Sequence, residues 1–172
     1  MHENVFIFYP AATVLFVLIQ LTVTKKERTA EFVWAVILTY AILFNIGVAG
    51  LMAFYAHAFM ADQTAAYIGW QAGSPFQFEI ACANLAFGLL GVLCVWLRST
   101  FRLATIIGYS VFLVGAAYGH IHEMTVAKNY APGNAGAPLY IDIITPTVLL
   151  SLWIIQYVIA KRGKEKPEIS MY

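Results

Sequence analysis

Long runs of apolar residues separated by short polar segments define the pattern of this chain. Five runs reach the roughly 20 residues that a helix needs to cross hydrocarbon about 30 Å thick. They cover approximately residues 5–23, 32–59, 76–97, 101–122 and 139–160. Membrane β-strands are shorter and alternate apolar with polar positions, which argues against a barrel. The pattern predicts an all-α fold in which residues 1–172 form a single domain, an integral membrane bundle of five transmembrane helices.

The basic residues predict how this bundle is oriented. Basic loops tend to stay in the cytoplasm, and nine of the ten lysines and arginines fall on one side if the N-terminus lies outside. Only Lys128 falls on the other side, so the predicted topology is N-out and C-in. Residues 1–10 carry no positive n-region and a basic segment follows the first run, which predicts a retained anchor rather than a cleaved signal.

Composition narrows the classes of function. The chain is 61% hydrophobic and 11% charged, whereas soluble domains are about half apolar and a quarter charged. A net charge of +1 offers no basic surface to nucleic acid, so the expected partner is the lipid bilayer. No CxxCH, P-loop, GxSxG or HExxH motif is present, which argues against the familiar hydrolases. Whether the protein is an enzyme stays open.

Ionisable residues gather near the predicted outer ends of the spans. Four different spans supply them, at similar depth, and such groups are costly in a membrane unless they are paired, solvated or ligated. The residues are His57, Glu79, His120, His122, Glu123 and Asp142. Their convergence predicts a shared polar site near the extracytoplasmic face. The longer outer loops, which carry most of the Asn, Gly and Pro turn residues, either belong to this site or only cap the bundle.

A metal centre is one hypothesis for this site. His120 and Glu123 are spaced i, i+3 and share a helix face. With Glu79 and His57 from neighbouring spans they would provide two nitrogen and two oxygen ligands, a set suited to Zn or Fe. The alternatives are that His120, His122 and Glu123 form a simple interfacial cluster at their helix end, and that Glu79 is an acid stabilised by its helix N-terminus.

A proton relay or ligand site is the other hypothesis. His120 would pass protons between the outer solvent and Glu79 or Asp142. Asp142 begins a polar stripe that continues along the fifth span to Gln156. The candidate relay or ligand residues are Asp142, Asn84, Tyr109 and Asn134.

Small residues predict where helices pack. Gly108, Gly115 and Gly119 form one face of the fourth span, suited to a close helix contact or to a partner subunit. Glu79 shares its stripe with Cys82, Ala83 and Ala86, so we expect it to face protein rather than lipid. Arg102, at the inner start of the fourth span, is explained first as a topological signal.

The last three spans also show a family resemblance. The run GWQAGSPFQFEIACANLAFGLLG, followed by FRLATIIGYSVFLVGAAYGHI, NYAPGNAG and YIDIITP, resembles a family of short multi-pass membrane proteins from bacteria and archaea catalogued only as a domain of unknown function. The resemblance spans residues 69–146, leaves His57 unsupported, and implies an inner-membrane location. It implies that a shared site is formed by Glu79, Asn84, Arg102, Gly119, His120, Asn134, Gly136 and Asp142.

Three functions follow as hypotheses. The first is a small polytopic membrane protein whose outer polar site, built from Glu79, His120, Glu123 and Asp142, binds a metal ion or a small polar ligand. The second is a proton-coupled transporter or channel. The third is an accessory subunit of a larger membrane complex, and a homo-oligomer is also open.

Overall fold

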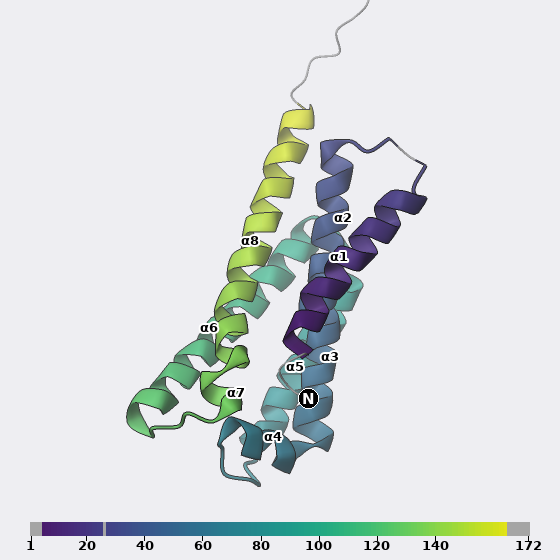
Figure 1. Ribbon diagram of the computed structural model, residues 1–172. Coiled ribbons are helices and arrows are strands. Elements are labelled where there is room, and N and C mark those ends of the chain that lie inside the picture. Colours follow the sequence, from purple (N-terminus) through teal and green to yellow (C-terminus); the bar gives the residue numbers. More distant parts are fainter. Residues whose placement is uncertain (1–4, 26, 165–172) are drawn as a thin grey trace, which may run out of the picture.

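Helices form the whole regular structure of the described chain in a computed structural model (Figure 1). The structure describes residues 5–25 and 27–164, and side chains from residue 7 to residue 163 apart from residue 26. The elements in chain order are α1 (Val5–Val23), α2 (Ala30–Ile42), η1 (Leu43–Val48), α3 (Ala49–Phe59), α4 (Ala61–Ile68), α5 (Phe76–Leu93), α6 (Thr100–Val126), α7 (Pro132–Ala135) and α8 (Ala137–Lys164).

Four helical stretches are long and apolar enough to cross a membrane. They are Ala30–Phe59, Phe76–Leu93, Thr100–Val126 and Pro132–Gly163. The first of them joins α2, η1 and α3 into one rod, and the last joins α7 to α8. The described part of α1 is apolar but shorter, Ile7–Val23. The all-helical prediction is therefore confirmed for the described residues, while a fifth crossing and the N-out orientation stay predictions.

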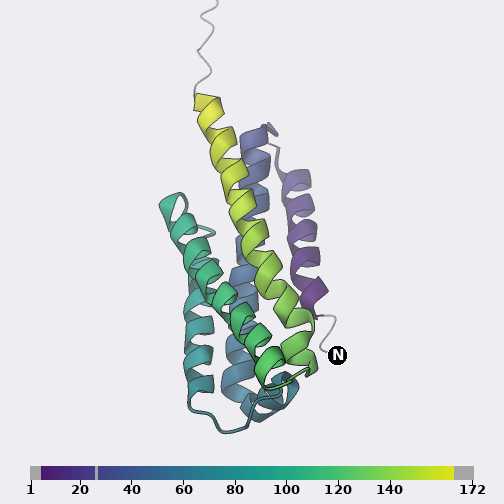
Figure 2. The same cartoon turned by 90° about the vertical axis from the view of Figure 1, so that its left-hand side faces the viewer.

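The connections at one end of the bundle contain more helix than the sequence pattern indicates. α4 lies within the segment expected to be a loop and ends at Gly69, whose φ of 81° is the left-handed conformation that glycine adopts at helix ends. α4 and α7 contact each other and together cover the lower end of the molecule in Figure 1. Figure 2 shows the long helices rising side by side from this end.

Glycines allow α3 and α5 to cross at close range. A Cβ built on Gly50 would lie 2.8 Å from the Asn84 carbonyl oxygen and 2.8 Å from the Gly88 amide nitrogen. Gly91 meets the backbone of Gly47 in the same way. Side chains larger than hydrogen cannot fit here without moving a helix, so these glycines set the distance between the two rods.

Arg102 is a buried connector between helices, with 2% of its surface exposed. Its Nε donates to the Cys94 carbonyl oxygen at 2.9 Å, and its Nη2 donates to the Thr39 hydroxyl at 2.8 Å. The residue therefore links α6 to α2 and to the end of α5. Its interpretation as a topological signal alone is too limited, because its guanidinium also satisfies polar groups inside the protein.

The rod formed by α2 and α3 contains a π-helical turn, η1. Within it, the Asn45 side chain donates to the Ala41 carbonyl oxygen at 2.9 Å and to the Thr13 hydroxyl at 3.2 Å. The second bond joins this rod to α1. π-turns interrupt α-helices at functional sites more often than elsewhere, and Asn45 lies on the wall of the cavity described next.

Candidate functional site

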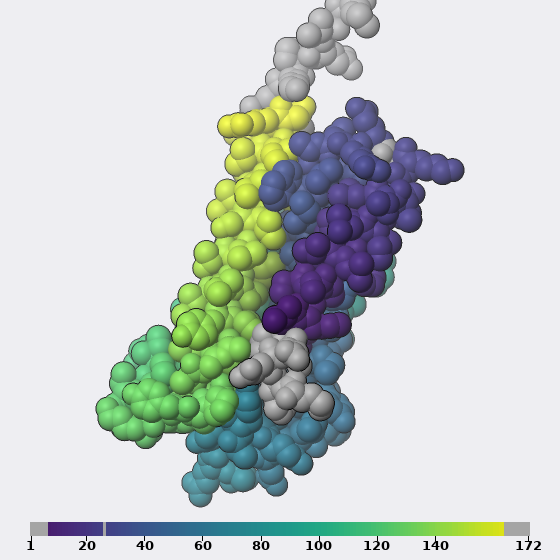
Figure 3. All heavy atoms as spheres, in the orientation of Figure 1, coloured from purple at the N-terminus to yellow at the C-terminus, as the bar shows by residue number. Residues whose placement is uncertain are grey.

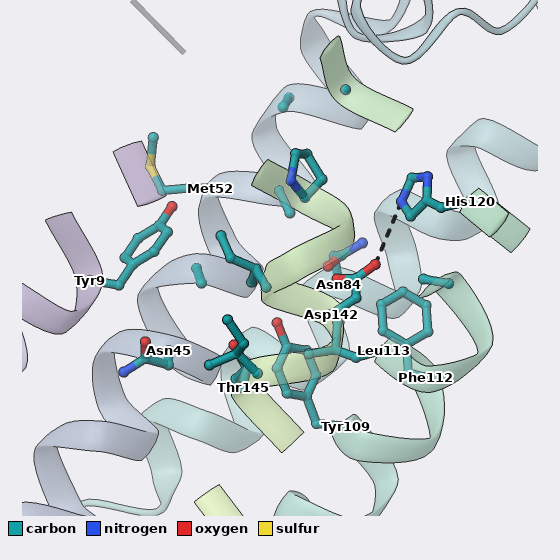
Figure 4. Close-up of a pocket in the computed structure, with 18 of the residues that line it drawn as sticks. Tyr9, Asn45, Met52, Asn84, Tyr109, Phe112, Leu113, His120, Asp142 and Thr145 are labelled. Atoms are coloured by element: carbon teal, nitrogen blue, oxygen red, sulfur yellow. Dashed lines mark ion pairs between the residues drawn. The ribbon is translucent and has the colours of Figure 1, made fainter. Parts of the chain in front are cut away.

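A large cavity lies between the helices and reaches the end covered by α4 and α7. Its volume is about 1640 Å³, larger than the roughly 300–1,000 Å³ of ordinary small-molecule sites. Every described helix contributes to its wall, from Tyr9 of α1 to Leu152 of α8. Figure 4 shows part of this wall, where Tyr109, His120 and Asp142 come from α6 and α8. Most of the other lining side chains are apolar.

His120 and Asp142 form a pair on this wall. The Nε2 atom of His120 lies 3.5 Å from Oδ2 of Asp142, and the two side chains are only 13% and 12% exposed. The dashed line in Figure 4 marks this contact. α6 and α8, which pack along one another, hold the two groups together. The site therefore combines an imidazole from the fourth predicted span with a carboxyl group from the fifth.

Asn134 fixes which nitrogen of His120 carries a proton. The Asn134 Nδ2 donates to the carbonyl oxygens of Asn129 and His120, at 2.8 and 3.2 Å. Its Oδ1 must therefore be the atom 2.7 Å from His120 Nδ1, and since that oxygen only accepts, Nδ1 carries hydrogen. The other nitrogen, Nε2, then faces Asp142. The contact between Nε2 and Oδ2 is favourable when one proton lies between the two atoms, bound either to the imidazole or to the carboxyl group.

The segment around α7 places Asn134 at the histidine. Asn134 is fully buried, and Gly133 before it lies against the Tyr67 ring, where a Cβ would lie 2.8 Å from the ring's Cε1. Asn129 anchors the same segment, because its side chain donates to the Ile68 carbonyl oxygen at 3.0 Å and accepts from the Ala131 amide at 3.1 Å. α4 and the α6–α7 connection are thus fastened together over the pair.

We expect Asn134→Ala to lower the stability of the fold by about 1–3 kcal/mol, the cost of leaving buried hydrogen-bonding groups without partners. The Asn129 and His120 carbonyl oxygens and the His120 ring would lose the bonds described above. Thermal unfolding of the purified protein in detergent measures the effect. His122→Ala is the control, since His122 is exposed; equal melting temperatures for both variants would contradict the structural role of Asn134.

Glu79 lies outside this site. Its side chain is exposed, and so are Cys82 and Ala86 of the same stripe. The inward face of α5 carries Gln77, Ala81, Asn84, Gly88 and Gly91 instead. The expectation that Glu79 faces protein is wrong, because the close crossing at Gly88 and Gly91 turns the opposite side of α5 towards α3.

The four predicted metal ligands do not come together. Within residues 5–25 and 27–164 no group of three His, Cys, Asp or Glu side chains is placed to hold a metal ion. Glu79 points outward, while His57, His120 and Glu123 line the cavity at separate points. His57 lies beside Trp70, with ring centroids 6.2 Å apart, and its Nδ1 is buried without a hydrogen-bond partner among the described residues. The orientation of α5 removes Glu79 from the predicted set, and the other three side chains do not form a metal-binding group in the described part of the chain.

The predicted relay or ligand residues Asp142, Asn84, Tyr109 and Asn134 all line the cavity. Asn84 donates to the Ile80 carbonyl oxygen at 2.9 Å within α5. Asp142 is followed by Thr145 and Leu149 on the same wall. The upper part of the stripe predicted from Asp142 to Gln156 leaves the cavity, and there Trp153 stacks on Tyr157 with ring centroids 5.2 Å apart.

The glycine face of α6 is divided between two roles. A Cβ on Gly108 would meet the Phe87 ring at 3.3 Å, whereas a Cβ on Gly115 or Gly119 would meet nothing within 4 Å. Gly115 and Gly119 line the cavity. Within the described chain they therefore leave space open and do not pack against another helix, which corrects the helix-packing interpretation for these two residues.

Exposed apolar residues also belong to the lining. Val14 is 59% exposed, Met52 52% and Ile144 56%, yet all three border the cavity. They lie within apolar helices, at positions a bilayer would contact. The cavity therefore communicates with the outer surface of these apolar helices. Figure 3 shows the face of the molecule to which α1 and α8 contribute.

Fold and site together define a membrane-like, all-helical protein with a His–Asp pair in a cavity between its helices. The chain belongs to DUF6790, a family of unknown function, which it matches over residues 3–162. The resemblance noted from the sequence is thus confirmed, and the match extends over the first two predicted spans and His57. No curated protein and no solved structure matches the chain.

Proposed function

We propose that this protein binds a small amphiphilic molecule within the membrane, with the ligand's polar end at the His120–Asp142 pair. The observation that carries the proposal is a cavity of about 1640 Å³ whose mostly apolar wall includes a buried acid–imidazole pair. Small-molecule sites combine an apolar lining with a few convergent polar groups in this way. The open connection to the apolar surface gives such a ligand a route from the bilayer.

The polar groups themselves support a binding role. An ion pair in an apolar setting contributes little to stability, because desolvation offsets its attraction. The pair at His120 and Asp142 is nevertheless held by a dedicated segment through Asn134. His120 is held in one orientation although it borders open space. Recognition of a ligand explains this better than packing does.

The proposal includes an orientation. We place the N-terminus outside and count α1 as a fifth crossing, because nine of the ten basic residues then lie in the cytoplasm. The end covered by α4 and α7 is extracytoplasmic in this arrangement. The His120–Asp142 pair then lies near the outer leaflet of a bacterial or archaeal inner membrane.

Native mass spectrometry of protein purified from its own membranes tests the binding role. We expect wild-type protein to carry an added mass that is not detergent, and Gly119→Leu to lose it because the leucine enters open cavity space. Ala104→Leu is the matched control, an exposed position on the same helix outside the cavity. Bare polypeptide mass in the wild type, or equal occupancy in Gly119→Leu, would overturn the proposal.

Proton-coupled transport is the second candidate. It is favoured by one observation, the orientation of Asn134 that leaves a single proton to be shared between His120 and Asp142. A pair that gains or loses this proton as a ligand arrives links binding to proton movement.

A further inference from the structure

The charges on the cavity wall are unbalanced in favour of acids. Among the described lining residues there are two carboxylates, Glu123 and Asp142, and no lysine or arginine. Three histidines also line the wall, His57, His120 and His122, and imidazole can release its proton near neutral pH. The wall therefore carries two carboxyl groups, of which Asp142 is paired with His120, and no lysine or arginine among its described residues.

Aromatic rings surround the same space. Seven of them contribute to the wall: Tyr9, Tyr55, Tyr67, Trp70, Tyr109, Phe112 and Tyr118. The faces of such rings attract cations electrostatically, most strongly where water is excluded. Figure 4 shows that the Tyr9 and Tyr109 rings come from different helices, α1 and α6, so one ligand can contact aromatic side chains of several helices.

Together these features favour one class of ligand. We propose that the amphiphile bound in this cavity is a lipophilic organic cation, held by Asp142 and by the aromatic wall. The inference rests on the proposed binding function and specifies its ligand. An anion of the same size would bring its charge beside Glu123 and Asp142 with no lysine or arginine on the described wall to offset it.

Two probe ions of matched size and opposite charge test the inference. Tetraphenylphosphonium and tetraphenylborate have the same shape, so their hydrophobic contributions are close to equal. Equilibrium dialysis against purified protein in uncharged detergent measures each affinity, with protein-free micelles as the blank. We expect wild-type protein to bind the phosphonium at least about thirtyfold more tightly than the borate, the effect of a desolvated charge pair.

Variants then locate the charge that is recognised. Asp142→Asn should weaken phosphonium binding at least about thirtyfold, while Glu79→Gln, which removes an exposed acid outside the cavity, should leave it unchanged. Circular dichroism and gel filtration report whether each variant folds, and the wild-type comparison of the two ions stands without any variant. Equal binding of both ions, or equal losses in the two variants, would overturn the inference.

The outcomes separate this inference from the proposed function. Borate binding that is equal to or tighter than phosphonium binding, and that Gly119→Leu abolishes, would keep a binding cavity and reject its preference for cations. An absence of phosphonium binding, together with a retained endogenous mass in the native spectrum, would lead to the same conclusion.

Discussion

Replacement of Gly91 by alanine is expected to destabilise the protein by about 1–3 kcal/mol or more, the cost of overpacking a close contact. A Cβ at this position would enter the backbone of Gly47 on the neighbouring rod. Backbone cannot move aside as the end of a flexible side chain can. Gly50→Ala is expected to behave alike, since its Cβ would lie 2.8 Å from backbone atoms of both Asn84 and Gly88.

The expected loss of stability in Gly91→Ala is opposite to the usual effect of this substitution in a helix. Glycine to alanine within a helix normally stabilises it by up to about 1 kcal/mol. Gly115→Ala on α6 is the control, because a Cβ there meets nothing within 4 Å, and its melting temperature should stay the same or rise. Thermal unfolding in one detergent compares the three variants. If Gly91→Ala is as stable as Gly115→Ala, α5 and the rod formed by α2, η1 and α3 do not cross at this distance.

Arg102→Met is expected to cost about 3–6 kcal/mol of folding stability. Hydrogen bonds from a charged donor are worth about 1.5–3 kcal/mol each, and Arg102 makes one to the Cys94 carbonyl oxygen and one to the Thr39 hydroxyl. The methionine keeps most of the apolar stem but leaves the carbonyl oxygen of buried Cys94 without this donor. Denaturant-dependent unfolding measures the loss.

Arg98→Met separates the structural role of Arg102 from its effect on topology. Arg98 is exposed in the same connection, and both substitutions remove one positive charge from a predicted cytoplasmic segment. A purely topological role for Arg102 predicts that the two variants unfold alike. The buried hydrogen bonds predict a loss in Arg102→Met alone.

The helices could be predicted from the chain because apolar length is a local property. The runs that begin near residues 76 and 101 correspond to α5 and α6 within a few residues at their starts. Their rotations could not be predicted in the same way. A helical wheel shows which residues of α5 share a face, but the choice between the Glu79 face and the Asn84 face depends on where α3 packs.

The same limit applies to the candidate site. His120, Asp142 and Asn134 were among the predicted polar residues, and the structure brings them together. The metal set required four side chains from three helices to point inward, and Glu79 does not. The burial of Arg102 had one local signal: at i, i+3 and i+7 it shares a helical stripe with Thr105 and Tyr109, both of which are buried. That stripe indicates that Arg102 lies on the inward face of its helix and not on the surface.

The π-turn at residues 43–48 also affects how family members should be aligned. Such a turn amounts to one additional residue inside an otherwise regular helix. A relative with a single-residue deletion in this segment would form an unbroken α-helix there, and everything beyond would rotate by about 100°. Its equivalent of Gly50 would then leave the crossing with α5, so a one-position gap would mark a differently assembled subgroup rather than a harmless length variation.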